Sequence, residues 1–170
     1  MSCVKTEIET LVGWAEAQPI VALQTRTAVS RCLVVSASRR RRKMLMRAAV
    51  DGGWDAIVCA DVENALAETR HSMFQLALID MWPYGGRTPK GFRNLCGHLS
   101  SSGDLLLAVC GHKGDAGEEI WARQCGTWLY LPGVVSRDDV SLLCGEALGI
   151  AKQLSHAKDG RRQRQVQASV

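Results

Sequence analysis

The sequence alternates five times between a short apolar run and a segment with the apolar spacing of an amphipathic helix. The apolar runs span residues 32–37, 54–60, 74–80, 104–111 and 127–133. The helical patterns span residues 38–53, 61–73, 88–103, 114–126 and 136–157. Strands that alternate with helices form βαβ units, whose crossovers are right-handed. The pattern therefore predicts an α/β fold, with one parallel sheet covered by helices on both faces in three layers.

Residues that favour helix starts stand where the helical patterns begin. Ser38 and Asp61 are expected N-caps because their side chains can accept a hydrogen bond from a free N–H of the first turn. Ser136 and Asp139 have the spacing of a capping box. The third helix is expected to start at Thr88, with Pro89 in its first turn.

The 170 residues are expected to hold one domain with an extension at each end. The domain is predicted over residues 30–157, after an N-terminal helical extension at 1–29. Residues 158–170 are polar and basic, and we expect them to be disordered. Within the extension an apolar stripe has helical spacing and is formed by Ile8, Leu11, Val12 and Ala15.

Composition narrows the class of protein. No run of about 18 apolar residues occurs, so we expect no membrane-spanning helix. The first residues are partly acidic and lack the apolar centre of a signal peptide. The seven cysteines are dispersed without a C-x-x-C pair, which favours reduced thiols over disulfides or a zinc site. A cytoplasmic location is the expectation.

The formal net charge of +4 comes largely from two clusters, Arg39–Lys43 and Gly160–Gln165. Local basic clusters can bind nucleic acid, here through Arg39–Arg42 and the basic tail. A helix distributes consecutive residues around its whole circumference, so a solvated helix face is the competing interpretation. Few aromatic residues accompany these clusters, which disfavours a stacking platform for single strands.

Asp80 stands at the end of the third apolar run, directly before a Trp-Pro turn. An ionised carboxylate at the end of a buried strand is costly unless something pairs with it. Ligands of parallel α/β sheets bind at this end of the strands. Asp80 is therefore a candidate reactive group, a candidate metal ligand, or the remnant of one.

Five βα units with Asp at the end of the third strand resemble the receiver domain of two-component response regulators. The resemblance covers roughly residues 30–154 and implies the flavodoxin-like strand order 2-1-3-4-5. It also implies a phosphoacceptor role for Asp80. In that family two acids end the first strand and bind Mg²⁺, a Ser or Thr ends the fourth strand, and a Lys ends the fifth. The cation offsets the repulsion between the carboxylate and the phosphoryl donor.

Only the third-strand position of this pocket carries the family residue. Ser36 and Ala37 stand where the resemblance requires the acidic pair. Cys110 occupies the hydroxyl position, and Leu131 occupies the lysine position before Pro132. This pattern is that of a degenerate receiver, or pseudo-receiver. We therefore expect no metal, no cofactor and no enzymatic activity.

A cation is expected to neutralise Asp80 in place of the metal. Arg39 or Arg40, at the start of the helix after the first strand, are candidates for an ion pair, and His112 is another. The alternative is that Asp80 only accepts hydrogen bonds from backbone N–H groups of its own loop.

The expected function is signalling through protein contacts, without Asp phosphorylation. Trp82 and Tyr84 form an exposed aromatic cluster beside Asp80, and packing over the emptied pocket is the alternative. In the receiver family the face made by the fourth helix, fifth strand and fifth helix is a common dimer surface. Here it would be formed by residues such as Ile120, Trp121, Trp128, Tyr130, Val140 and Leu143. The N-terminal stripe is a second candidate surface. Catalysis by Cys110 with His112 is disfavoured, and an atypical regulator phosphorylated on Asp80 is the first rival.

Overall fold

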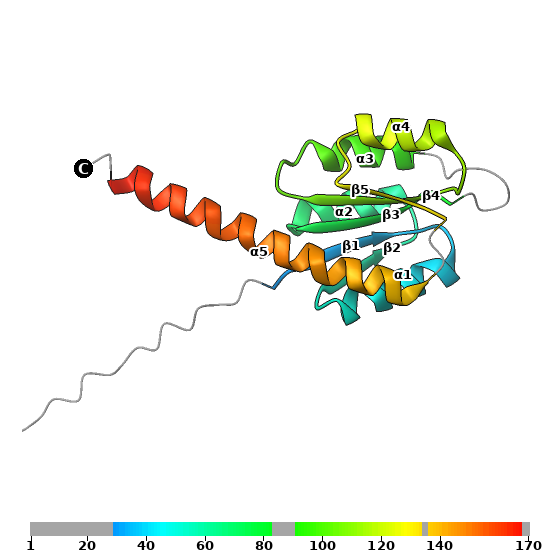
Figure 1. Ribbon diagram of the computed structural model, residues 1–170, viewed down its shortest axis with the longest axis horizontal. Coiled ribbons are helices and arrows are strands. Elements are labelled where there is room, and N and C mark those ends of the chain that lie inside the picture. Colours follow the sequence, from blue (N-terminus) through cyan, green and yellow to red (C-terminus); the bar gives the residue numbers. More distant parts are fainter. Residues whose placement is uncertain (1–28, 83–90, 134–135, 168–170) are drawn as a thin grey trace, which may run out of the picture.

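The structure is a computed structural model that describes residues 29–82, 91–133 and 136–167. Its five parallel strands form one sheet in the order β2-β1-β3-β4-β5, which confirms the expected fold (Figure 1). The elements are β1 (Arg31–Val35), α1 (Arg39–Asp51), β2 (Asp55–Cys59), α2 (Val62–His71), β3 (Leu76–Asp80), α3 (Phe92–Ser100), β4 (Leu106–Gly111), α4 (Ala116–Gln124), β5 (Leu129–Pro132) and α5 (Arg137–Gln167).

Alternate residues of each central strand face opposite sides of the sheet. In β1, Cys32 and Val34 contribute to a core with α1 and α5. Leu33 and Val35 contribute to a second core with α2, α3 and α4. Every residue of β3 and β4 is buried. Because both faces are covered, these strands have continuous apolar sequences instead of alternating ones.

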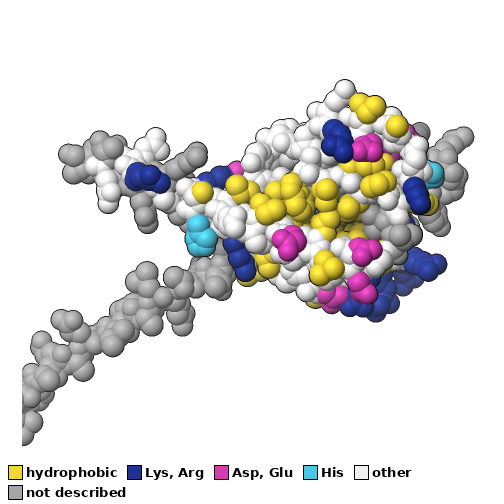
Figure 2. Space-filling model, viewed as in Figure 1, with side chains coloured by type: hydrophobic (Ala, Val, Ile, Leu, Met, Phe, Trp, Pro, Cys, Tyr) yellow, Lys and Arg dark blue, Asp and Glu magenta, His cyan; other side chains and the backbone are white. Residues whose placement is uncertain are grey.

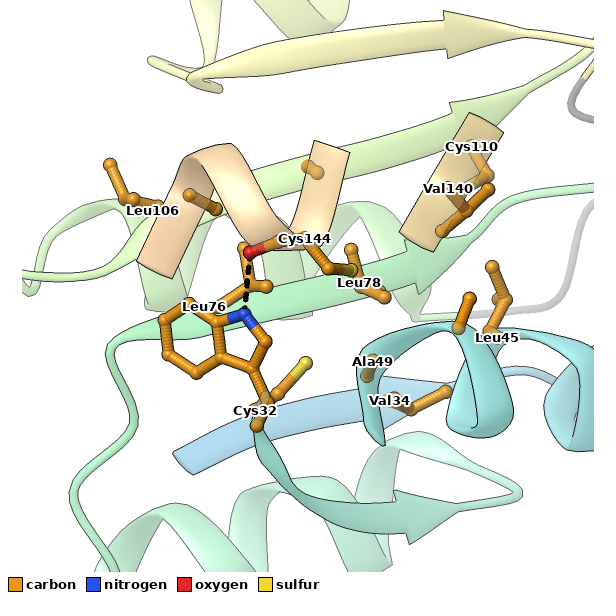
Figure 3. Close-up of a cluster of buried hydrophobic side chains, with 14 of the residues drawn as sticks. Cys32, Val34, Leu45, Ala49, Leu76, Leu78, Leu106, Cys110, Val140 and Cys144 are labelled. Atoms are coloured by element: carbon orange, nitrogen blue, oxygen red, sulfur yellow. Dashed lines mark hydrogen bonds between the residues drawn. The ribbon is translucent and has the colours of Figure 1, made fainter. Parts of the chain in front are cut away.

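A close approach between α1 and α5 closes the first core. The Trp54 indole N–H donates a buried hydrogen bond of 2.7 Å to the carbonyl of Cys144 (Figure 3). Gly52, the C-cap of α1, lies directly against α5. A Cβ at this position would lie 2.4 Å from the Cβ of Cys144. The glycine is therefore needed for helix packing.

The predicted caps are confirmed where the structure describes them. Ser38 Oγ accepts from Arg41 N at 3.4 Å, and Asp61 Oδ1 accepts from Asn64 N at 2.8 Å. Ser136 Oγ accepts from Asp139 N at 3.4 Å, which is one of the two hydrogen bonds of the expected capping box.

The third helix begins later than expected. It starts at Phe92, after Gly91 at a φ of +79°. This left-handed conformation suits glycine because it has no Cβ. Thr88 and Pro89, the predicted start, lie outside the described residues.

The last helix is longer than expected. It continues to Gln167, so residues 158–167 are helical where we expected disorder. Adding residues to an existing helix is easier than starting one, and the arginines and glutamines of this segment are good helix formers. Lys158 also forms an ion pair with Asp104. The N-terminal extension up to residue 28 lies outside the described residues. In the part of the chain that is described, no helix has both the length and the apolar character needed to cross a membrane.

Gly52→Ala is predicted to lower the free energy of unfolding by about 1–3 kcal/mol, because the added methyl group overpacks the contact between α1 and α5. Chemical denaturation measures this change. Gly149→Ala is the matched control, since a Cβ on this α5 glycine meets nothing within 4 Å. The control gains helix propensity, so it is expected to be neutral or stabilising. Equal losses in both variants would contradict the packing argument.

Candidate functional site

Asp80 is the last residue of β3, and only 2% of its surface is exposed to solvent. The sheet register pairs it with Cys110 of β4. Ser36 follows β1 directly, on the side of β3 opposite to β4, and it is fully buried. The carboxyl ends of three neighbouring strands therefore meet around this carboxylate.

Both carboxylate oxygens of Asp80 accept hydrogen bonds. Arg41 Nε donates to Oδ1 at 3.0 Å and to Oδ2 at 2.9 Å. Ser36 Oγ donates to Oδ2 at 2.7 Å, and the backbone N–H of Trp82 donates to Oδ1 at 3.3 Å. One guanidinium and two neutral donors thus compensate the cost of burying the charge.

The position of Arg41 follows from the register of α1. Leu45 and Ala48 are buried, and Arg41 lies four and seven residues before them on the same helix face. Helical side chains tilt toward the N-terminus, so an arginine in the first turn of this face extends over the strand ends. Its side chain is 18% exposed. The neighbouring Arg42 donates from Nη1 to the carbonyl of Ser36 at 2.7 Å.

The structure thus uses a different arginine from the two that we expected. Arg39 and Arg40 are exposed on α1, and the described contacts of Asp80 include neither of them nor His112. The expected kind of partner, a cation from this helix, is present. The alternative also holds in part, because Trp82 donates a backbone hydrogen bond from the same loop.

Trp82 covers the ion pair. The Arg41 guanidinium carbon lies 5.0 Å from the centre of the Trp82 ring. His112 stacks on the same indole with ring centres 5.1 Å apart and an angle of 27°. His112 therefore joins the site through Trp82. Tyr84, the other member of the expected aromatic cluster, lies outside the described residues.

A second buried carboxylate, Glu118 of α4, was not among the sequence candidates. It is 3% exposed, and its Oε1 accepts from the His112 backbone N–H at 3.0 Å and from the Tyr130 hydroxyl at 2.9 Å. Burial raises the pKa of Tyr130, and the hydrogen bond to Glu118 raises it further. A Cβ on Gly111 would lie 2.1 Å from Glu118 Oε1, so this network needs glycine there.

The sequence contained only a weak signal for Glu118. It precedes the buried Ala122 by four residues and so shares its helix face. Its hydrogen-bond partners are His112, directly after β4, and Tyr130 of β5, so no helical or strand repeat within one element relates them to it. The pairing therefore depends on tertiary structure.

Cys110 is fully buried at the end of β4. Burial, followed by the negative charge of Asp80, raises the pKa of its thiol to about 12. The thiol is therefore protonated at neutral pH, and the thiolate is the nucleophilic form of cysteine. This disfavours catalysis by Cys110 with His112.

Comparison with known proteins identifies the fold. No family model and no curated protein matches the chain. Solved structures do match. The receiver domain protein (CheY-like) from Methanospirillum hungatei JF-1 has a TM-score of 0.63 at 16% identity, over 74% of this chain and 98% of that one. The orphan response regulator HP1043 of H. pylori has a TM-score of 0.59 at 13% identity, over 70% and 96%.

The chain has the receiver fold. NtrX from Brucella abortus, in complex with ATP, matches with a TM-score of 0.65 at 20% identity and over 77% of this chain. The match covers 29% of that NtrX chain, so this chain corresponds to a part of the larger regulator.

The residues at the receiver pocket do not fit a magnesium site. Ser36 uses its hydroxyl to donate to Asp80, and Ala37 offers no side-chain oxygen. Among the residues described at the three strand ends, Asp80 is the only carboxylate, and Arg41 pairs with it. Mg²⁺ needs six oxygen ligands in octahedral geometry. Among the described residues, no group of three or more His, Cys, Asp or Glu side chains could hold a metal ion.

The expected contact aromatics of the receiver fold are mostly used for packing. Trp128 packs on the first core and Tyr130 on the second. Trp121 also packs on the second core, with Arg93 4.8 Å from its ring centre. The large exposed apolar side chains are Ile120 of α4, which the expected face includes, and Leu142 of α5, and they are 57% and 73% exposed.

A groove lies between the end of β5 and the start of α5. Leu131, which the resemblance to receivers aligned with their lysine, contributes to its lining. Hydrophobic side chains gather over β5 between α4 and α5 (Figure 2). The groove is lined by Leu131, Pro132, Gly133, Ser136, Asp139, Val140 and Leu143.

The two basic clusters lie at opposite ends of the molecule. Arg39–Arg42 begin α1 at the carboxyl end of the sheet. Residues 158–167 form the far end of α5, which projects past the amino ends of the strands (Figure 1). The two clusters therefore do not form one continuous basic surface within a single chain.

Arg41→Ala is predicted to lower the free energy of unfolding by about 3 kcal/mol, because it leaves the buried Asp80 carboxylate without a cation. Asp80→Ala is also expected to be destabilising. The loss in the double variant should be smaller than the sum of the two single losses, because the second substitution removes a charge that is already unpaired. Denaturation of all three variants measures the coupling.

Arg40→Ala is the matched control, since Arg40 is the exposed neighbour on the same helix. It should stay within about 0.5 kcal/mol of the wild type. Additive losses for Arg41 and Asp80, or an equal effect at Arg40, would show that the ion pair does not stabilise the fold.

Proposed function

We propose that this chain is a pseudo-receiver that acts in signalling through protein contacts, without Mg²⁺-dependent phosphorylation of Asp80. The observation that carries the proposal is the ion pair between Asp80 and Arg41, in which Arg41 Nε lies 3.0 and 2.9 Å from the two carboxylate oxygens. In this ion pair Arg41 binds the carboxylate that a receiver would present to its phosphoryl donor.

Charge explains why the pair opposes phosphoryl transfer. A carboxylate that attacks a phosphoryl donor needs a cation that binds both partners, and a receiver supplies Mg²⁺ for this. Arg41 binds the carboxylate oxygens directly and lies under the Trp82 ring. The lysine position holds Leu131, so the product phosphate would also lack its counter-charge.

The indole of Trp82 is a built-in reporter for this pocket, because it covers Arg41 beside Asp80. Its fluorescence is predicted to stay unchanged when Mg²⁺ and then beryllofluoride, a phosphoryl mimic, are added. Trp82→Phe identifies the contribution of this indole among the five tryptophans. Incubation with acetyl phosphate and Mg²⁺, followed by intact-mass spectrometry, should show no added phosphoryl group.

A saturable fluorescence change that is lost in both Trp82→Phe and Asp80→Asn would contradict the proposal. So would stoichiometric phosphorylation of Asp80. Either result would favour the rival function, a regulator that is phosphorylated on Asp80 through an atypical metal site.

The proposed contact surface is the face formed by α4, β5 and α5. Ile120 of α4 and Leu142 of α5 expose large apolar side chains on these helices. The neighbouring groove has Leu131 in its lining where a receiver carries a lysine. Clusters of apolar side chains that are exposed to solvent are a common feature of protein contact sites. We propose a second copy of this chain as the first partner to test, since receivers commonly dimerise through this face.

Leu142→Asp is predicted to weaken self-association at least tenfold, because it places a charge on the most exposed large apolar side chain of α5. Light scattering across a concentration series measures the dissociation constant. Val50→Asp is the matched control, since Val50 is 54% exposed but lies on α1. A wild-type protein that stays monomeric at all concentrations would contradict the dimer and leave the phosphorylation result unaffected.

A further inference from the structure

The apolar seam of α5 extends beyond the part of the helix that the sheet covers. Its buried residues follow one another at spacings of four, three and four, and they are Val140, Cys144, Ala147 and Ala151. The next position in this series is Leu154, which is 44% exposed. The seam therefore continues in register past the domain core.

The core ends near Ala151. This residue belongs to the same buried cluster as Leu76 and Leu106, the first residues of β3 and β4, and Cys32 near the start of β1. These strand starts lie together under α5 (Figure 3). Beyond them α5 projects from the domain (Figure 1). Residues 152–158 are all exposed.

The chain contains a segment that matches this surface. Residues 5–18 have the pattern of an amphipathic helix, with an apolar stripe that includes Leu11 and Val12. The strand that follows this segment in sequence, β1, starts at Arg31, at the end of the sheet where α5 leaves the domain. The intervening residues 19–30 can span up to about 40 Å, whereas α5 from residue 151 to 167 is about 24 Å long.

Charge favours this segment over the α5 helix of a second copy as the partner of the exposed seam. Residues 152–167 carry five basic residues and one acid, namely Lys152, Lys158, Arg161, Arg162, Arg164 and Asp159. Residues 5–18 carry three acids and one base, namely Glu7, Glu9, Glu16 and Lys5. Two copies of the α5 projection would repel each other, whereas the N-terminal segment attracts it.

We propose that residues 5–18 pack as a helix along the exposed seam of α5 at Leu154 in the same chain. The apolar stripe covers Leu154, and the glutamates face the basic residues of the projection. This inference is independent of the function proposed above, because it uses the opposite end of the sheet from Asp80.

Carbodiimide cross-linking of the full chain tests the proposal. This zero-length reagent joins a carboxylate to a neighbouring amine. Cross-links are expected from Glu9 or Glu16 to Lys152 or Lys158, and peptide mass spectrometry detects them. The ion pair of Lys158 with Asp104 provides an internal positive control. An equal mixture of ¹⁴N and ¹⁵N protein distinguishes links within a chain, which keep one isotope, from links between chains.

Substitutions on each side of the contact test the apolar seam. Leu11→Asp and Leu154→Asp should each reduce the yield of the N-terminal cross-links at least fivefold, and the link of Lys158 with Asp104 should remain. Gln153→Asp is the matched control, because Gln153 is exposed and lies off the seam. Leu154 is already partly exposed, so its substitution should leave the melting temperature within a few degrees of the wild type.

Three results would overturn the proposal. The first is a missing N-terminal cross-link when the Lys158–Asp104 link forms. The second is a cross-linked peptide of mixed isotope content, which would assign the seam to a second copy. The third is an unchanged yield in Leu154→Asp, which would show that charge attraction alone brings the segments together.

Discussion

The ion pair between Asp80 and Arg41 determines what the carboxyl end of this sheet can do. A charge that is 98% shielded from solvent has to be paired, and Arg41, Ser36 and the N–H of Trp82 provide the donors. In the receiver family a metal cation offsets the charge of this carboxylate. Here Arg41 of α1 supplies a positive charge at the same place.

The pair also organises its surroundings. Trp82 packs over Arg41 and stacks on His112, whose backbone N–H is bound by Glu118. The Tyr130 hydroxyl donates to the same glutamate oxygen. A continuous series of contacts therefore runs from Asp80 through the β4 end to α4 and β5. These contacts join the segments that border the proposed contact face, which favours one fixed conformation of that face.

Local signals predicted the fold, while the site depended on tertiary register. The strand and helix alternation and the caps at Ser38 and Asp61 are encoded within a few residues, and the structure confirms them. The choice of Arg41 over Arg39 or Arg40 depends on which face of α1 is buried. Leu45 and Ala48 contain that information, since they lie four and seven residues after Arg41. The Glu118 network joins elements that only the folded sheet brings together.

The two ends of the sheet carry different features. At the carboxyl end Arg41 pairs with the buried Asp80, and Leu131 contributes an apolar side chain to the adjoining groove. At the amino end α5 continues past Ala151 with Leu154 in the register of its buried residues. A partner on the α4, β5 and α5 face would contact the first turns of α5, whereas the N-terminal segment would cover its last turns. Because the two surfaces share no described residue, occupation of one leaves the other accessible, and the two proposals stand or fall separately.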